Sequence, residues 1–205
     1  MTQSFSLADF PYVNLTEITG DIAADVKKLL TANDKEETYI HSRAVAETNV
    51  KIAEMYQLDS DLCRLSGYLH DISAVVNADD MLQYIKENDM FLDEAEGKYP
   101  FLIHQRISKM IARDWFKITN GAALSAMGCH TTLREYASAY DMALFVADKL
   151  SWDQNGRPPF YDIVRDALQL SLEKASEAYI DYVIENGMIL CPHSWLTQAR
   201  RWLKI

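Results

Sequence analysis

The segment DSDLCRLSGYLHD, residues 59–71, is the most informative stretch for the fold. It opens with side chains that cap helix N-termini and ends on a histidine and an aspartate, His70 and Asp71. In the turns before His70, one face of the predicted helix carries small side chains, those of Cys63, Ser66 and Gly67. Small side chains let another helix approach closely, so the segment predicts a tightly packed helix pair beside His70.

The rest of the chain also has helical periodicity, and no strand alternation is convincing. With only seven glycines and five prolines in 205 residues, turns are few. We therefore predict an all-α, single-domain bundle of about eight to ten helices over residues 21–205, preceded by an irregular lead-in over residues 1–20. Besides 59–71, helices are expected over residues 33–56, 77–89, 101–116, 120–130, 141–150, 160–169, 171–186 and 193–204.

Charge and cysteine content limit the partners. A formal charge of −10 argues against nucleic acid, because binding to phosphate backbones needs clustered lysine and arginine. No stretch approaches the length of a membrane span, and the first thirty residues lack a secretory signal, so no membrane partner is expected. Three well-separated cysteines suit a reducing compartment. We expect a cytoplasmic protein.

Four of the five histidines fall on faces expected to point inward. His41 lies on the stripe predicted to be apolar in the helix 33–56, formed by Ile40, Ala44, Val45, Thr48, Ile52 and Met55, opposite Arg43, Glu47, Lys51 and Glu54. The other inward residues are His70, His104 and His130, joined by Asp71 and by Asp148 at the end of the apolar run ALFVAD. A single buried histidine is usually a hydrogen-bonded core residue.

Six such residues on five helices are hard to explain as independent core residues. Imidazole and carboxylate are the ligands that divalent iron, manganese and zinc share, so the set predicts a metal site. Other chemistries lack their motifs, since the chain has no GxSxG elbow, no glycine-rich phosphate loop and no HExxH helix. The fifth histidine, His193, is interpreted as a structural or surface residue.

These residues form a recognisable set. His41, the LHD of GYLHDISAV (67–75) and Asp148 in VADK resemble the H…HD…D signature of HD-domain phosphohydrolases. His104 in FLIHQRIS and His130 in GCHTTL resemble the branch that holds two metals. With HSRAVAET (41–48) and IDYVIENG (180–187), they resemble the bacterial YqeK-type branch, which hydrolyses diadenosine tetraphosphate symmetrically to two ADP and is associated with iron. The resemblance covers roughly Thr38 to the C-terminus and implies an HD-type helical bundle.

The resemblance also implies roles for the residues. One divalent ion would be held by His41, His70, Asp71 and Asp148, and a second by His104, His130 and a bridging Asp71. Iron is expected, with manganese or another first-row metal left open. His70 and Asp71 would be the catalytic pair, because a water between two such ions is deprotonated near neutral pH and can attack phosphorus.

The expected partner is a small-molecule nucleotide, and a homodimer is left open. Candidates for contacting its phosphates are Lys149, Arg134 and Arg106, with Lys149 favoured because it adjoins Asp148. Trp152, Phe160 and Tyr161 are candidates for stacking on a base, although aromatic side chains at such spacing more often fill a core.

Several positions depart from the branch. Position 44 is Ala44 where an arginine is usual, and the neighbouring Arg43 is expected on the solvent side. Gln105 and Leu133 replace glycines, and the segment 149–162 is longer than usual. A shifted nucleotide preference therefore stays open. So do a hydrolase of another phosphate ester, di-iron oxygen chemistry, and a metal-bound nucleotide sensor without turnover.

Overall fold

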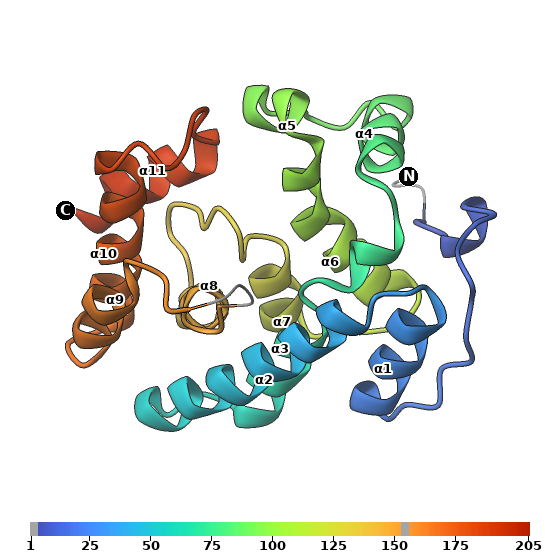
Figure 1. Ribbon diagram of the computed structural model, residues 1–205, viewed down its shortest axis with the longest axis horizontal. Coiled ribbons are helices and arrows are strands. Elements are labelled where there is room, and N and C mark those ends of the chain that lie inside the picture. The colour runs from blue at the N-terminus through green and yellow to red at the C-terminus, as the bar shows by residue number, and fades with distance from the viewer. Residues whose placement is uncertain (1–3, 153–155) are drawn as a thin grey trace.

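The computed structural model describes residues 4–152 and 156–205, and these ranges contain helices but no strand (Figure 1). The all-α class is confirmed. Three 3₁₀ turns accompany the α-helices: η1 (Leu7–Asp9), η2 (Ile72–Val75) and η3 (Pro100–Ile103). The eleven α-helices are α1 (Ile22–Ala32), α2 (Glu36–Tyr56), α3 (Ser60–Leu69), α4 (Ala78–Glu87), α5 (Glu94–Lys98), α6 (His104–Asp114), α7 (Gly121–Met127), α8 (Ala139–Leu150), α9 (Tyr161–Leu168), α10 (Leu172–Glu185) and α11 (Ser194–Leu203).

Helix α8 is the central element of the fold. It packs against α2, α3, α7, α9 and α10, and Figure 1 shows it end-on between α9–α11 and the α6–α7 region. Seven consecutive residues, Asp141 to Ala147, are buried. A helix that is apolar nearly all round must be enclosed on all sides, as this one is. Its last turn carries Asp148 into the interior.

The predicted tight helix pair is formed by α2 and α3. A Cβ atom placed on Gly67 would lie 2.5 Å from Ala46 Cα and 2.8 Å from Ala46 N, which leaves no room for any side chain. The amide of Asn49 on α2 donates to the Cys63 carbonyl on α3 at 2.8 Å. The small residues before His70 therefore bring the two helices together, and with them His41 and His70.

The start and the buried face of α2 differ from the sequence prediction. Asn33 ends α1, where its side-chain amide donates to the Leu29 carbonyl at 2.8 Å, so it does not cap α2. Ile40 and Met55 are 55% and 48% exposed, whereas Ser42, Val45, Ala46, Asn49, Ile52 and Ala53 are buried. The stripe is rotated because small and polar side chains meet α3 at close range, where bulky ones would not fit.

The N-terminal lead-in packs on the helical core. Residues 1–3 lie outside the described ranges. Phe5, Leu7 and Val13 are buried in the same apolar cluster as the helices, and the Phe5 N–H donates to the Asp114 carboxylate at 2.8 Å. Residues 4–20 are largely irregular, with the short turn η1 as an exception. The lead-in therefore covers part of the core.

No helix in the described part of the chain has both the length and the apolar character that membrane crossing requires.

Candidate metal centre

Four imidazoles and two carboxylates meet at one point in the bundle. They come from five places in the sequence: His41 from α2, His70 and Asp71 from the junction of α3 and η2, His104 from the start of α6, His130 from the turn after α7, and Asp148 from the last turn of α8. His70 and His130 are fully or almost fully buried, with exposed fractions of 0% and 1%. The helices thus carry polar side chains into an interior that would otherwise be apolar.

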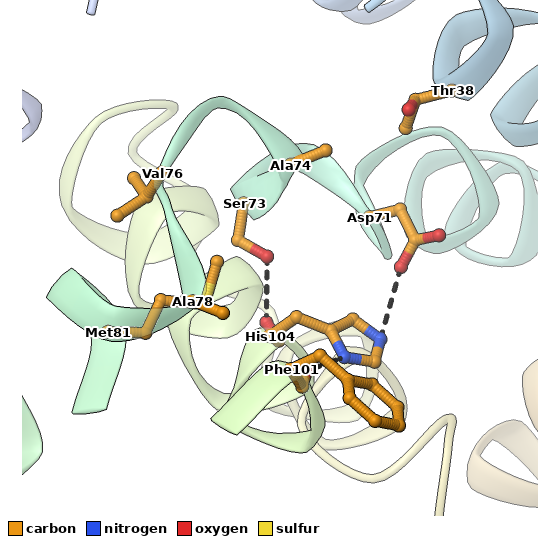
Figure 2. A pocket seen from close by; sticks show the side chains of 9 residues that line it. All are labelled: Thr38, Asp71, Ser73, Ala74, Val76, Ala78, Met81, Phe101 and His104. Carbon is orange, nitrogen blue, oxygen red and sulfur yellow. Dashed lines mark hydrogen bonds and ion pairs between the residues drawn. The ribbon is translucent and has the colours of Figure 1, made fainter. Parts of the chain in front are cut away.

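The six side chains form two groups that share Asp71. In the first group, His41 Nε2 lies 3.1 Å from Asp148 Oδ1, and His70 Nε2 lies 3.3 Å from Asp71 Oδ2. In the second group, the Nε2 atoms of His104 and His130 each lie 3.3 Å from Asp71 Oδ1. Figure 2 shows the Asp71 carboxylate facing the His104 ring. One carboxylate therefore lies between two sets of imidazoles.

Main-chain carbonyls fix the orientation of three imidazoles. The Nδ1 atoms of His70, His104 and His130 lie 2.7, 2.6 and 2.9 Å from the carbonyl oxygens of Gly67, Phe101 and Met127. A carbonyl can only accept, so each Nδ1 carries a hydrogen, and in the neutral ring Nε2 presents a lone pair to the cluster. Metal-binding histidines are commonly held in this way by the nitrogen that does not bind the metal.

With the rings oriented in this way, the centre of the cluster needs positive charge to be stable. The Nε2 atoms of His104 and His130 are 3.0 Å apart, and those of His41 and His70 are 3.3 Å apart. Asp71 Oδ1 is buried and has no hydrogen-bond donor. Lone pairs and carboxylate oxygens at these distances repel one another unless cations lie between them. The donors around Asp71 therefore fit divalent first-row ions. They form two groups, and within each group the ligand atoms all lie within 4.8 Å of one another: His41, His70 and Asp71 in the first, and Asp71, His104 and His130 in the second.

The pKa values of the cluster follow from the same charges. Burial lowers the pKa of His70, but Asp71 and Asp148 outweigh it and raise that pKa to about 10. Burial lowers the pKa of His130 to about 4, against a smaller opposing effect of Asp71. For both aspartates burial raises the pKa, yet their cationic neighbours hold it well below its usual range, chiefly His70 for Asp71 and Lys149 for Asp148. Without metal, a proton on His70 supplies part of the missing positive charge.

The three basic residues expected at the phosphates have different surroundings. Lys149 Nζ donates to Asp148 Oδ2 at 2.5 Å, beside the cluster. Arg106 donates to Glu96 and to the Phe91 carbonyl, both at 2.8 Å. Arg134 pairs with the buried carboxylate of Asp141 at the start of α8, at 3.3 Å. The two arginines thus have structural partners, and Lys149 remains the strongest candidate for phosphate contact.

Of the aromatic residues considered for base stacking, Phe160 and Trp152 belong to the apolar cluster, and Tyr161 is half-buried outside it. Phe160 is 2% exposed and its ring centroid lies 5.8 Å from that of Trp152 and 4.9 Å from that of Tyr179. The Tyr161 ring lies under the Arg157 guanidinium at 4.7 Å. These contacts favour the core interpretation of Phe160 and Trp152 over base stacking, and Tyr161 packs against an arginine instead.

Arg43 lies on the solvent side of α2, as predicted. Its side chain is 53% exposed and its partner is Glu47 at 3.8 Å, one turn along the helix. We predict that Arg43→Ala changes the free energy of unfolding by less than about 0.5 kcal/mol and leaves the Michaelis constant unchanged, because exposed ion pairs contribute little. Urea unfolding and steady-state kinetics measure the two quantities. A large rise in the Michaelis constant would show that Arg43 contacts the substrate.

Gln105 holds the turn that follows His130. Its side chain is fully buried, and Oε1 accepts from the N–H groups of Thr131 and Thr132 at 3.1 and 3.3 Å. Its Nε2 donates to Thr132 Oγ1 at 3.1 Å. The turn directs Thr131 Oγ1 to within 3.0 Å of His104 Nε2, so a hydroxyl lies at the cluster. Leu133, at the end of the same turn, is buried with a left-handed φ of 54°, a backbone conformation that glycine adopts at lower cost than leucine.

We predict that Gln105→Ala lowers the free energy of unfolding by about 1–3 kcal/mol, because it leaves two backbone N–H groups without acceptors in the interior. Chemical denaturation followed by circular dichroism measures this change. Gln83, which is exposed on α4, provides a matched control, and Gln83→Ala is expected to have almost no effect. Equal stability of both variants would contradict the role given to Gln105.

Two hollows adjoin the cluster and share Phe101. The metal-side hollow, of about 320 Å³, is lined by Thr38, Asp71, Ser73, Ala74, Val76, Ala78, Met81, Phe101 and His104 (Figure 2). The C-terminal hollow, of about 310 Å³, is lined by Tyr99, Phe101, Leu102, Thr131, Thr132, Lys149, Tyr179, Met188, Ile189, Leu190, Cys191, His193 and Leu196. Fold and cluster together define a helical protein with a histidine–aspartate centre that opens into the metal-side hollow, while the C-terminal hollow lies beside it at Thr131 and Lys149.

Comparison with known proteins agrees with this description. The family model described as "HD domain" matches residues 38–153, more than half of the chain. A Staphylococcus aureus protein named bis(5'-nucleosyl)-tetraphosphatase, symmetrical, is 30% identical over 72% of this chain and 76% of its own length. A Lactococcus lactis protein, described as an uncharacterized protein in the pepC 5' region, is 37% identical over 68% of this chain and 71% of its own length.

A solved structure has the same fold. It is a Clostridium acetobutylicum protein described as a predicted HD superfamily hydrolase involved in NAD metabolism, with a TM-score of 0.77 and 24% identity over 88% of this chain and 96% of that chain. The chain therefore belongs to the HD-domain hydrolase family, in its YqeK-type branch.

Proposed function

We propose that this protein hydrolyses dinucleoside tetraphosphates symmetrically, with diadenosine tetraphosphate giving two ADP as the expected reaction. The observation that carries the proposal is the position of Asp71 between two imidazole groups, with one hollow at Asp71 and His104 and a second nearby at Thr131 and Lys149. Two hollows near one cluster suit a substrate with an arm on each side of the bond that is cut. The printed name of the Staphylococcus aureus relative supports the same substrate class.

The reaction cuts the phosphate chain at its central bridging oxygen. Water adds to the phosphorus on one side, the bond from that phosphorus to the bridging oxygen breaks, and two nucleoside diphosphates leave. When bound, divalent ions neutralise phosphate charge and lower the pKa of water. The leaving nucleoside diphosphate is a stable anion, so a strong proton donor for it is unnecessary.

The chain's own residues have distinct parts in this proposal. His41, His70, Asp71 and Asp148 would hold one ion, and His104 and His130, with Asp71 shared, the second. The carbonyls of Gly67, Phe101 and Met127 keep three of the imidazoles aimed at the centre. Lys149 would contact a phosphate oxygen, because its ammonium group is beside Asp148 and borders the C-terminal hollow.

The test combines metal analysis with a substrate panel. Purified protein is analysed for bound first-row metals and then assayed with dinucleoside tri-, tetra- and pentaphosphates, NAD, mononucleotides and simple phosphate esters. The products are separated by chromatography. The expected result is a bound divalent metal and two equivalents of ADP from diadenosine tetraphosphate. ATP plus AMP as products, or turnover of only mononucleotides or esters, would contradict symmetrical cleavage.

A further inference from the structure

The C-terminal hollow has an unusual charge for this molecule. The chain has a net charge of −10, yet the thirteen residues that line the hollow include one lysine and no aspartate or glutamate. The metal-side hollow, in contrast, contains Asp71, and a third hollow near the N-terminus contains Asp9, Asp80 and Glu87. The C-terminal hollow is therefore suited to an anionic group.

Its polarity changes from the inner end to the mouth. The inner end is polar, since Thr131 Oγ1 is 3.0 Å from His104 Nε2 and Lys149 Nζ donates to Asp148. At the mouth, Phe101, Met188 and Leu190 are 57%, 48% and 85% exposed. Large apolar side chains exposed around a hollow commonly mark a ligand site. A molecule with a phosphate at one end and a flat, weakly polar group at the other matches this gradient.

Buried polar contacts hold the outer wall in place. His193 Nδ1 accepts from the Trp195 N–H at 3.0 Å, and His193 Nε2 lies 3.7 Å from Glu96 Oε1. Asp93 Oδ2 accepts from the Ser194 N–H at 3.1 Å. His193 and Glu96 are 4% and 1% exposed. These groups tie the segment 188–193 to α5, and His193, expected to be structural, also lines the hollow.

We propose that the C-terminal hollow binds one nucleoside of the substrate, with the base between Phe101 and the wall formed by residues 188–191 and the adjoining phosphate at Lys149. Its volume of about 310 Å³ suits one nucleoside. The other half of the substrate then extends over the metal-side hollow. This assignment rests on the proposed function, because it presumes that the phosphates reach the cluster.

The test compares ADP with inorganic pyrophosphate, which has no nucleoside. Both are titrated calorimetrically into the full-length protein loaded with Mn²⁺. In the wild-type protein, ADP is expected to bind at least about tenfold more tightly than pyrophosphate. Met188→Asp and the uncharged Met188→Asn should each remove most of this difference and leave pyrophosphate binding unchanged. Leu170→Asp is the control, because Leu170 is 77% exposed and lines neither hollow.

Two results would overturn the assignment: equal affinities of the wild-type protein for ADP and pyrophosphate, or wild-type ADP binding in both Met188 variants. Failure of the proposed function is seen separately, as absence of dinucleoside tetraphosphate cleavage by the wild-type protein. The calorimetric result is independent of that cleavage assay, because the protein can prefer ADP over pyrophosphate through Met188 whether or not it cleaves dinucleoside tetraphosphates.

Discussion

Asp71→Ala is expected to remove bound metal and to lower hydrolysis by at least about 10³-fold, which corresponds to roughly 4 kcal/mol of lost transition-state stabilisation. The physical reason is that one carboxylate serves both imidazole groups. Its oxygens lie 3.3 Å from His70 on one side and 3.3 Å from His104 and His130 on the other. No neighbouring carboxylate can replace it in the second group, because Asp148 contacts His41 and His70.

Elemental analysis and steady-state kinetics measure the two effects. Asp71→Asn retains the shape of the side chain and should behave like Asp71→Ala, which separates the loss of charge from a packing defect. Asp79→Ala, at an exposed carboxylate of α4, is the control. Circular dichroism verifies that each variant is folded. Normal turnover by folded Asp71→Ala would rule out the role given to Asp71.

Gly67→Ala is expected to lower the free energy of unfolding by about 3 kcal/mol, because overpacking of this kind costs roughly 1–3 kcal/mol and occasionally more. The new Cβ would lie 2.5 Å from Ala46 Cα; it is bonded directly to the backbone of α3, and Ala46 Cα belongs to the backbone of α2, so neither atom can move without its helix. Alanine gains about 0.5–1 kcal/mol over glycine within a helix, which is too small to offset the clash. The separation of α2 from α3 would also move His41 away from His70, so weaker metal binding is expected.

Urea unfolding and metal titration of the same samples test both effects. Gly121→Ala is the matched control, since a Cβ at that position meets no atom within 4 Å. This variant should be as stable as the wild-type protein or slightly more stable. Wild-type stability of Gly67→Ala would mean that the two helices separate at little cost.

The fold class was predictable because its signals are local. Helical periodicity and caps depend on neighbouring residues, and the small side chains of Ser66 and Gly67 indicated a close helix contact that the structure has. The six inward residues were recognisable from their residue types and their order in the chain. Their function as metal ligands is still a prediction, because geometry alone does not identify an ion.

Features that depend on distant contacts were missed. The orientation of α2 was wrong at Ile40 and Met55, since periodicity does not show where a partner helix approaches most closely. The burial of Phe5 and Leu7 has no periodic signal, because their segment is largely irregular. The C-terminal hollow was not predictable either, since it combines residues as far apart as Tyr99 and Leu196. The sequence showed Gln105 only as a departure from the branch, whereas the structure shows that its side chain holds the turn at Thr131 and Thr132.

The anchoring of three imidazoles to carbonyls of their own turns has a consequence for how the protein acquires its ions. Each ring is held by a bond spanning three residues, so its aim is set by local backbone and does not depend on an ion being there. Half of the six side chains are consequently oriented towards the centre by the backbone alone. Metal binding would then require little reorientation of these three rings, which lowers its entropic cost.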